Sequence, residues 1–310
     1  MADVVSNDKS TQTIYYGGQA VIEGVMIRGP EHMAIAVRNP EGKITKHVEK
    51  LKGVSTGNLR SIVFIRGILV LWETLTLGTR ALLFSSRIAY AEEKDDGEVI
   101  EFPEKALWGS MLISLVMVTS IFFVGPVLLS NLLGLLNWSH AAIVSIESIL
   151  RIVMFVGYIG LISLMPDIKR VFQYHGAEHM TIHAYEHNKS IDIPNIRLFP
   201  KEHTRCGTSF LLVVIVIALV TFILFDVFVD KGILVRIVSR IILLPPIAAL
   251  SYEILRIGAR FESSKIIKIL FAPNIALQKL TTREPEDDQI EVAIEALKLT
   301  LSATEKKPLE

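Results

Sequence analysis

The sequence predicts a mainly α-helical, polytopic membrane protein of about four spans, with a small β-containing N-terminal cytosolic cap and amphipathic interfacial helices. Hydrophobic residues make up 51% of the 310-residue chain and charged residues 21%, which is too apolar for an ordinary soluble protein. Four apolar runs each approach or exceed the roughly 20 residues that cross a bilayer. They are residues 107–136, 141–165, 209–229 and 233–257.

Lysine and arginine residues are unevenly distributed among the segments that join these runs. Residues 130–140 contain none, whereas residues 167–207 contain six. By the positive-inside rule, we expect the 167–207 segment and both termini to face the cytoplasm. The lipid bilayer is therefore the first expected partner. A formal net charge of zero gives no reason to expect binding to nucleic acid.

Residues 1–57 form the predicted cap, and residues 58–93 a helix that follows it. In the cap, two alternating segments flank the turn Asn39-Pro40-Glu41-Gly42, which predicts a β-hairpin over 33–48. We expect the helix to be membrane-associated and to lie along the bilayer rather than span it, because charges at the centre of a span are costly. Its charged residues recur at every seventh position and form one line that we expect to face water. They are Arg66, Glu73, Arg80 and Arg87.

The remaining segments complete the predicted organisation. Residues 94–105 are an acidic linker, and residues 106–285 form the four-span membrane domain, which includes a cytosolic His/Glu loop over 166–207. Within that domain, residues 261–280 are amphipathic. Residues 286–310 comprise a C-terminal surface helix and a tail. The apolar side of this helix carries Ile290, Ala293, Ile294 and Leu297.

The most unusual feature is a set of histidine and glutamate residues on the apolar face of a helix that continues from the second predicted span. At 3.6 residues per turn, His175, Glu178 and His179 share one stripe with apolar residues on either side. Buried polar groups need hydrogen bonds, a metal or a bound ligand. We therefore expect a functional site here.

Residues 175–179 have the His-x-x-Glu-His form. Histidines at i and i+4 share a helical face and can bind one divalent transition metal, most readily zinc, with Glu178 as the general base. The alternative is a hydrogen-bonded polar cluster that seals the helix against the rest of the protein. Gly176 costs about 1 kcal/mol of helix propensity relative to alanine, which indicates a functional demand or a helix start.

A third ligand can come from the segment that precedes the third predicted span. His203 and Cys206 are both candidates, and Glu186 could replace either as an oxygen ligand. Three protein ligands and one open position are typical of catalytic zinc, whereas four ligands are typical of structural zinc. His183 and Arg205 are further candidate site residues. Cys206 is the lone cysteine, so no intramolecular disulfide can form, and in the cytoplasm it stays reduced.

Three more charged residues are candidates for the site. Glu23 and Arg28 lie in the glycine-rich segment 15–30, whose glycines indicate a backbone that turns tightly or approaches another group closely. These two residues either complete the site or form an ion pair that braces the cap. Glu253 follows two prolines that break the last predicted span. It either faces the histidine cluster or extends toward the membrane interface.

Three segments together resemble a known family. They are GGQAVIEGVM at 17–26 with Arg28-Gly29-Pro30 after it, YHGAEH at 174–179 and RCGTSF at 205–210. In these segments, and over most of its length, the chain resembles the YqhQ-like family, a domain of unknown function in bacterial membrane proteins generally described as predicted metal-dependent enzymes. Where that family usually has His-Pro-Arg-Cys, residues 203–206 read His-Thr-Arg-Cys, which retains the ligands and alters the loop. The resemblance implies a protein of the bacterial cytoplasmic membrane.

Two classes of function follow from these observations. The first is a membrane-bound metal-dependent enzyme, most plausibly a hydrolase, with its site at the cytosolic membrane edge. The second is a non-enzymatic membrane factor, either a scaffold for the assembly of membrane proteins or a transporter or carrier. The second class would act through a membrane-protein partner or as an oligomer.

Overall fold

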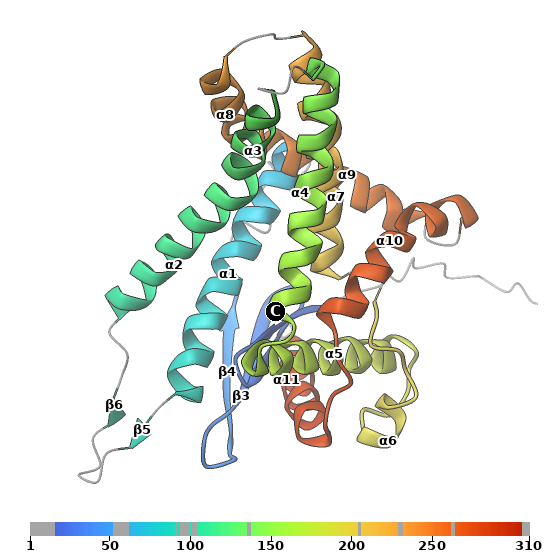
Figure 1. The fold of residues 1–310 in the computed structure, drawn as a ribbon. Coiled ribbons are helices and arrows are strands. Elements are labelled where there is room, and N and C mark those ends of the chain that lie inside the picture. The colour runs from blue at the N-terminus through green and yellow to red at the C-terminus, as the bar shows by residue number, and fades with distance from the viewer. Residues whose placement is uncertain are drawn as a thin grey trace, which may run out of the picture.

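The computed structural model describes residues 16–51, 62–90, 92–93, 99–100, 104–134, 138–203, 206–228, 232–261 and 264–305. It contains a bundle of long helices with a cap of mixed sheet and helix at one end (Figure 1). The acidic stretch 94–98 and Arg205 lie outside the described residues.

The cap contains a four-stranded antiparallel sheet in the order β1-β2-β3-β4. Its strands are β1 (Gly17–Val21), β2 (Gly24–Arg28), β3 (His32–Arg38) and β4 (Ile44–Lys50). The hairpin predicted over 33–48 is confirmed as β3 and β4. The preceding hairpin, β1 and β2, was not predicted, although the glycines of that segment did indicate a tight turn.

Helices make up most of the rest of the chain. In order they are α1 (Ile65–Ala89), α2 (Glu104–Thr119), the π-helical η3 (Ser120–Val124), α3 (Gly125–Gly134), α4 (His140–Ile162), α5 (Pro166–Glu186), α6 (Ile193–Ile196), α7 (Gly207–Phe228), α8 (Ile233–Ile242), α9 (Leu244–Arg260), α10 (Lys265–Thr281) and α11 (Asp287–Glu305). Two short strands, β5 (Glu92–Glu93) and β6 (Val99–Ile100), pair between α1 and α2.

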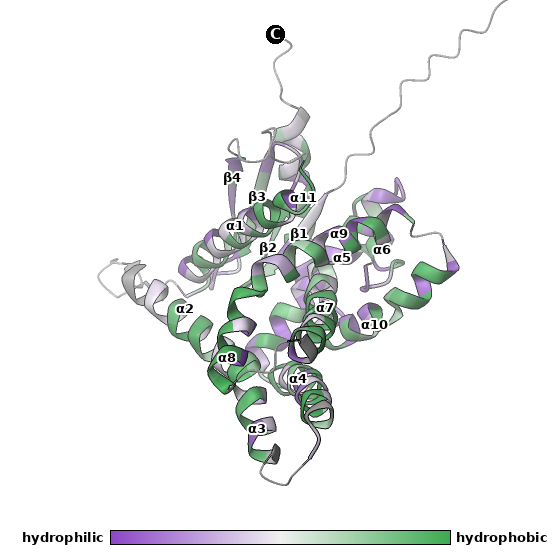
Figure 2. Ribbon diagram, turned by 90° about the horizontal axis from the view of Figure 1, so that it is seen from above, coloured by the Kyte–Doolittle hydropathy of each residue, from purple (hydrophilic) through white to green (hydrophobic). Residues whose placement is uncertain are grey.

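Among the described residues, four helices are long and apolar enough to cross a membrane. They are Ile65–Ala89, Trp108–Leu132, Ala142–Ile162 and Gly207–Asp226. A fifth candidate is the pair α8 and α9, which bends by 45° next to Leu243. In Figure 2 the hydrophobic colour covers α2, α3, α4 and α7, whereas β4 is largely hydrophilic. Three of the predicted apolar runs therefore coincide with three of these helices, and the last predicted span is a bent pair. Helix α1, which was expected to lie along the bilayer, is also long and apolar enough to cross it.

Helix α1 differs from its expected setting. Two of the four residues in its line of charges, Arg66 and Glu73, are largely buried against protein, whereas Arg80 and Arg87 are exposed. Three of the four form ion pairs with other elements. Arg66 Nε donates to Glu253 Oε1 at 2.7 Å, Glu73 pairs with Arg28 at 2.9 Å, and Arg80 pairs with Glu49 at 3.0 Å. The expectation of a water-facing charge line therefore holds for Arg80 and Arg87 and is wrong for Arg66 and Glu73. The ion pairs attach α1 to α9 and to the sheet.

The sheet is covered on both faces. On one face, Val25, Ile27 and Ala36 pack in a core with apolar side chains of α5 and α11. On the other face, Met26 and Ile35 belong to a core that includes apolar side chains of α1. Successive strand residues point to opposite faces, so β2 and β3 are apolar along almost their whole length. The predicted apolar side of the C-terminal helix is buried against this sheet and α5.

Helix α5 is separate from α4 and does not continue it, contrary to expectation. A turn at 163–165 ends α4, and Pro166 begins α5, which runs across the end of the bundle (Figure 1). Gly176 is inside α5, so it does not mark a helix start. A Cβ there would collide with the Arg283 carbonyl oxygen, and the Arg283 N–H donates to the Phe172 carbonyl at 2.8 Å. The α10–α11 connection therefore crosses α5 at its glycine.

A buried charge network links helices in the apolar part of the bundle. The i,i+4 spacing of Glu147 and Arg151 predicts a neutralising pair, and the two side chains lie 3.0 Å apart. Arg240 bridges Glu147 at 3.1 Å and Asp226 at 2.6 Å. Arg236 also pairs with Glu147. Each of these charges is thus compensated by an opposite charge, Arg151 by Glu147 of its own helix and the others across helices, as burial in an apolar environment requires.

The close approach at Gly176 generates a stability prediction. We expect Gly176→Ala to lower the free energy of unfolding by about 1–3 kcal/mol, because the added methyl must displace the Arg283 backbone. Gly157→Ala in α4 is the matched control, since its Cβ would meet no atom within 4 Å. The control should be neutral or slightly stabilising. Denaturant unfolding in detergent micelles measures both, and equal stability of the two variants would contradict the predicted collision.

Candidate metal centre

Three elements bring the candidate site residues together. Helix α5 carries His175, Glu178, His179 and His183 on its buried side, and Cys206 directly precedes α7. Gln278 of α10 holds the intervening loop, because its amide oxygen accepts from the His203 N–H at 2.8 Å. Its amide nitrogen donates to the His203 carbonyl at 2.9 Å. The fully buried Gln278 side chain therefore fixes the loop next to α5.

The protonation of two imidazole rings is fixed by backbone carbonyls. His175 Nδ1 lies 2.8 Å from the Thr281 carbonyl oxygen, and His179 Nδ1 lies 2.6 Å from the Lys201 carbonyl oxygen. A carbonyl oxygen only accepts, so each Nδ1 carries the proton and each neutral ring keeps its lone pair on Nε2. Burial also lowers the pKa of His179, which favours the neutral ring.

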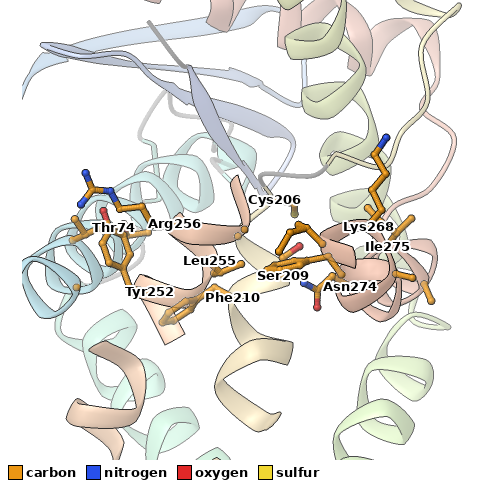
Figure 3. A pocket seen from close by; sticks show the side chains of 18 of the residues that line it. Thr74, Cys206, Ser209, Phe210, Tyr252, Leu255, Arg256, Lys268, Asn274 and Ile275 are labelled. Atoms are coloured by element: carbon orange, nitrogen blue, oxygen red, sulfur yellow. The ribbon is translucent and has the colours of Figure 1, made fainter. Parts of the chain in front are cut away.

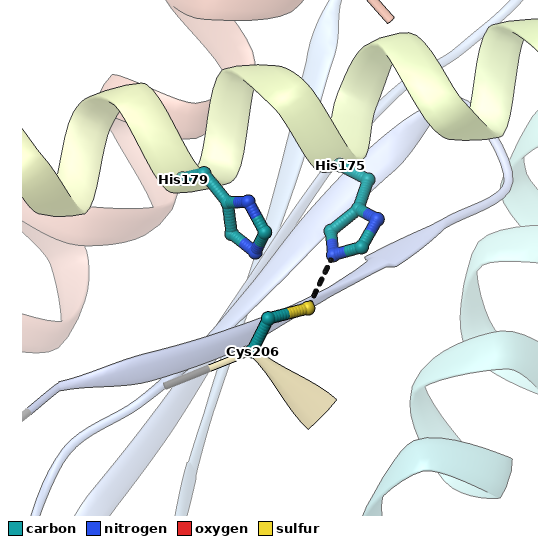
Figure 4. A group of neighbouring side chains, drawn as sticks. All are labelled: His175, His179 and Cys206. Carbon is teal, nitrogen blue, oxygen red and sulfur yellow. Dashed lines mark hydrogen bonds between the residues drawn. The ribbon is translucent and has the colours of Figure 1, made fainter. Parts of the chain in front are cut away.

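These Nε2 atoms share a small space with the thiol of Cys206. His175 Nε2 lies 3.2 Å from Cys206 Sγ (Figure 4). One ligand atom from each of His175, His179 and Cys206 lies within 4.8 Å of the other two. A tetrahedral zinc centre with bonds of about 2.0–2.3 Å keeps its ligand atoms roughly 3.3–3.8 Å apart. The donor set and its spacing therefore fit such an ion after small side-chain movements.

The sulfur of Cys206 has donors of its own. The Thr208 N–H donates to Sγ at 3.4 Å, and Thr208 Oγ1 lies 3.1 Å from it. The cysteine is buried and free. Hydrogen bonds of this kind, from groups that do not themselves touch a metal, orient metal ligands and tune their basicity.

A second group of three metal-binding side chains lies beside the first. His183, Glu186 and His203 also offer ligand atoms within 4.8 Å of one another. His203 Nε2 lies 3.3 Å from Glu186 Oε2, and His183 Nε2 donates to the Glu202 carbonyl at 2.9 Å. The rings of His179 and His203 are 5.7 Å apart. The sequence left His203 and Cys206 as alternatives, and they fall into different groups.

Glu178 lies at the edge of the first group. Its side chain is buried, and Oε2 is 3.5 Å from His179 Nε2. The Gly18 backbone N–H donates to this carboxylate, and burial raises the pKa of Glu178. A Cβ on Gly18 would lie 2.7 Å from Glu178 Cγ, so only glycine lets β1 approach so closely. The close approach expected of the glycine-rich segment is therefore confirmed, and its partner is Glu178.

A cavity of about 240 Å³ lies over these side chains. The polar residues in its wall come from β1 and β2, α5 and the loop before α7. They include Arg28, His175, Glu178, His179, His203 and Cys206. A small polar group that entered the cavity would thus meet the carboxylate, the imidazoles and the thiol together.

Glu23 and Arg28 have different partners from those expected. Glu23, in the β1–β2 turn with φ 49°, accepts two hydrogen bonds of 2.6 Å from Arg170 and one of 3.2 Å from Tyr174. The alternative of a Glu23–Arg28 ion pair is wrong, because Glu23 pairs with Arg170 of α5 and Arg28 pairs with Glu73 of α1. Arg28 lines the cavity, whereas Glu23 fastens α5 to the sheet.

Glu253 does not face the histidine cluster, because Arg66 occupies its carboxylate. That expectation was wrong. Gln278, Thr281 and Lys201 were missed in the sequence. Two of the three contribute only a backbone carbonyl to the histidines, for which a sequence carries no side-chain signal.

Comparisons with known proteins place the chain among uncharacterised relatives. A family model described as "Protein of unknown function (DUF1385)" matches residues 62–303. The "Uncharacterized protein YqhQ" of Bacillus subtilis (strain 168) is 36% identical over 296 residues, which cover 91% of this chain and 90% of the relative. No solved structure matches.

The buried setting of His183 predicts a pH dependence of stability. Burial lowers the pKa of His183 to about 4 from its ordinary 6.5, so the unfolded chain takes up this proton first as the pH falls. The contribution of neutral His183 to the free energy of unfolding is complete above about pH 6.5 and is lost progressively as the pH falls to about 4. In metal-free protein, His183→Gln should flatten the pH dependence of the free energy of unfolding there, by up to about 1.4 kcal/mol per pH unit.

The exposed His187, one turn later, provides the matched control. Unfolding of the His187→Gln variant should follow the parent protein across the same pH range. A slope that is unchanged in His183→Gln would contradict the buried neutral state of His183.

Proposed function

This chain belongs to the DUF1385 family of proteins of unknown function, and we propose that it is a membrane-bound metal-dependent hydrolase. His175, His179 and Cys206 hold the ion. One observation carries the proposal: both rings donate Nδ1–H to backbone carbonyls, which leaves the two Nε2 lone pairs beside the thiol sulfur. Metal-binding histidines almost always have such a partner on the second nitrogen.

The proposed location is the cytoplasmic membrane of a bacterium, with several spans and with both termini and the metal centre on the cytoplasmic side. The four apolar helices support insertion into a membrane. The six Lys and Arg residues of the 167–207 segment support its cytoplasmic orientation. The centre then lies where the cap meets the ends of the apolar helices, at the membrane edge.

The nitrogen and sulfur ligands favour zinc among divalent transition metals. Three protein ligands leave one position for a substrate oxygen or a water molecule, as in catalytic zinc sites. When bound, the ion would polarise a carbonyl or phosphoryl oxygen as a Lewis acid.

The side chains around the ion have distinct proposed roles. Glu178 is the general base, because its carboxylate is 3.5 Å from a ligand nitrogen and its raised pKa makes it a better proton acceptor. It would take a proton from the attacking water and return it to the leaving group. Gly18 holds this carboxylate through its N–H. Arg28 lines the cavity wall and is paired with Glu73 of α1 at 2.9 Å, so its guanidinium can donate a hydrogen bond to a substrate oxygen but adds little net charge.

The metal content of the purified protein tests this proposal. We expect about one tightly bound zinc ion per chain and loss of at least nine-tenths of it in the double variant His175→Ala/His179→Ala, because two of the three ligands are removed. His187→Ala is the matched control, because His187 is an exposed histidine that directly follows α5 and is not one of the three ligands. This variant should keep the ion. Glu178→Gln should also keep it, because Glu178 is not a ligand. Elemental analysis by mass spectrometry measures all four proteins.

A protein that holds no stoichiometric metal after mild purification would contradict the proposal, as would a metal content unchanged by the double substitution. Either result would favour the non-enzymatic alternative, a membrane-protein scaffold or carrier that acts with a partner or as an oligomer. A content near two ions, halved by His203→Ala, would extend the centre to the second group of ligands.

A further inference from the structure

A second and larger cavity adjoins the candidate metal centre. It measures about 850 Å³ and lies between α1, α7, α9 and α10 (Figure 3). Thr74, Cys206 and Gly207 line both cavities. A ligand in the larger cavity can therefore reach the thiol of the metal centre.

The wall of the larger cavity is predominantly apolar. Val70 and Leu71 of α1, Phe210 of α7 and Phe271 of α10 contribute side chains to it. Three of its four helices, α1, α7 and α9, belong to candidate spans. Its size is that of pockets for drug-sized or lipid-like molecules, so a hydrocarbon chain that enters from the bilayer fits its chemistry.

The charged residues in the described part of the wall are all cations. Arg256, Lys268 and Lys279 line the cavity and are exposed, and none of the described lining residues is an aspartate or glutamate. Glu253 of α9 lies near Arg256, but its carboxylate is paired with Arg66. In Figure 3, Arg256 and Lys268 lie on opposite sides of the cavity, with Cys206 between them. This arrangement is complementary to an anionic group held close to the metal centre.

Asn274 adds a buried polar group to the wall. Its side chain is 5% exposed, and it lines the cavity. Within the described part of the chain, its amide makes no hydrogen bond to protein. Its amide atoms are not among the fully buried side-chain polar atoms that lack a partner, so they are open to the cavity, where a ligand ester or hydroxyl group would give them a hydrogen bond.

We propose that this cavity binds an anionic phospholipid. The acyl chain lies along the apolar wall, the headgroup lies among the three cations, and Asn274 donates to an ester oxygen. Binding itself does not depend on the proposed function. The further claim that the lipid is the substrate rests on the proposed function, because only a metal centre at Cys206 would act on the headgroup.

A hydrophobic peptide segment suits the cavity less well. Its backbone N–H and C=O groups would need partners inside an apolar cavity. The wall offers few, chiefly Thr74, Ser209, Tyr252 and Asn274, and Ser209 already accepts from Gln278. A lipid needs polar partners only for its headgroup and ester groups, and the cations and Asn274 of the wall can supply these.

Native mass spectrometry of the full chain in detergent, with dioleoylphosphatidylglycerol or dioleoylphosphatidylcholine added, tests the proposal. We expect the anionic lipid to bind at least about ten-fold more tightly. Lys268→Gln/Lys279→Gln should weaken its binding roughly 30-fold, from about 1 kcal/mol for each charge. Lys265→Gln, a neighbouring exposed lysine of α10 outside the cavity wall, should change it less than two-fold.

Ala276→Trp provides a second variant that leaves the core intact. Ala276 is an exposed lining residue, so an indole there narrows the cavity without disturbing the folded interior. It should weaken binding of both lipids, with an unchanged thermal unfolding curve.

Several outcomes would overturn the lipid site. The first is equal binding of the two lipids. The second is a loss of affinity in Lys265→Gln as large as that in Lys268→Gln/Lys279→Gln. The third is displacement of the lipid by an apolar peptide whose affinity is unaffected by Lys268→Gln/Lys279→Gln. The same measurement on His175→Ala/His179→Ala separates the two proposals. Retained binding of the anionic lipid by that variant supports the lipid site whether or not the wild type holds metal. If the wild type holds zinc but binds the two lipids equally, the lipid site is refuted and the metal centre is not.

Discussion

Two hydrogen bonds from imidazole N–H groups to backbone carbonyls determine what the polar face of α5 can do. They direct the Nε2 lone pairs of His175 and His179 toward Cys206. The accepting carbonyls belong to Thr281 and Lys201, which lie on opposite sides of α7 in the sequence. Both must be in place before the rings are oriented, and a ring left without its acceptor would lose about 1–3 kcal/mol. The positions of α10 and of the α6–α7 loop are therefore required for the orientation of both imidazole rings.

The cap holds α5 in the position that this arrangement of side chains requires. Glu23 fixes its first half through Arg170 and Tyr174, and the sheet and α11 cover it from the other sides. Glycine is needed wherever a backbone must come closest: Gly18 lets β1 reach Glu178, and Gly176 lets the α10–α11 connection pass. These contacts join the N-terminal sheet, the central loop and the C-terminal helix around one helix. The apolar bundle continues directly from this junction, so a polar cavity and an apolar one meet at Cys206.

Periodicity in the sequence was sufficient for much of this architecture. Apolar runs located the candidate spans, alternation located the β3–β4 hairpin, and the His-x-x-Glu-His spacing placed His175, Glu178 and His179 on one buried face. The predictions that failed concern contacts between segments that are distant in the sequence. Arg66 and Glu73 of α1 face protein because their partners are on α9 and β2. The division of His203 and Cys206 between two groups of possible ligands depends on a loop held by Gln278, 75 residues from His203, and no local pattern contains that information.

X-ray absorption at the zinc edge of the purified protein tests the central claim most directly, because it reports the atoms bound to the ion. The proposed centre predicts one sulfur at about 2.3 Å and nitrogen or oxygen neighbours at about 2.0–2.1 Å, with imidazole scattering from two rings. Cys206→Ser should remove the sulfur shell. A shell without sulfur in the wild type, or one with two or more sulfur atoms, would contradict a centre made of His175, His179 and the single thiol of Cys206.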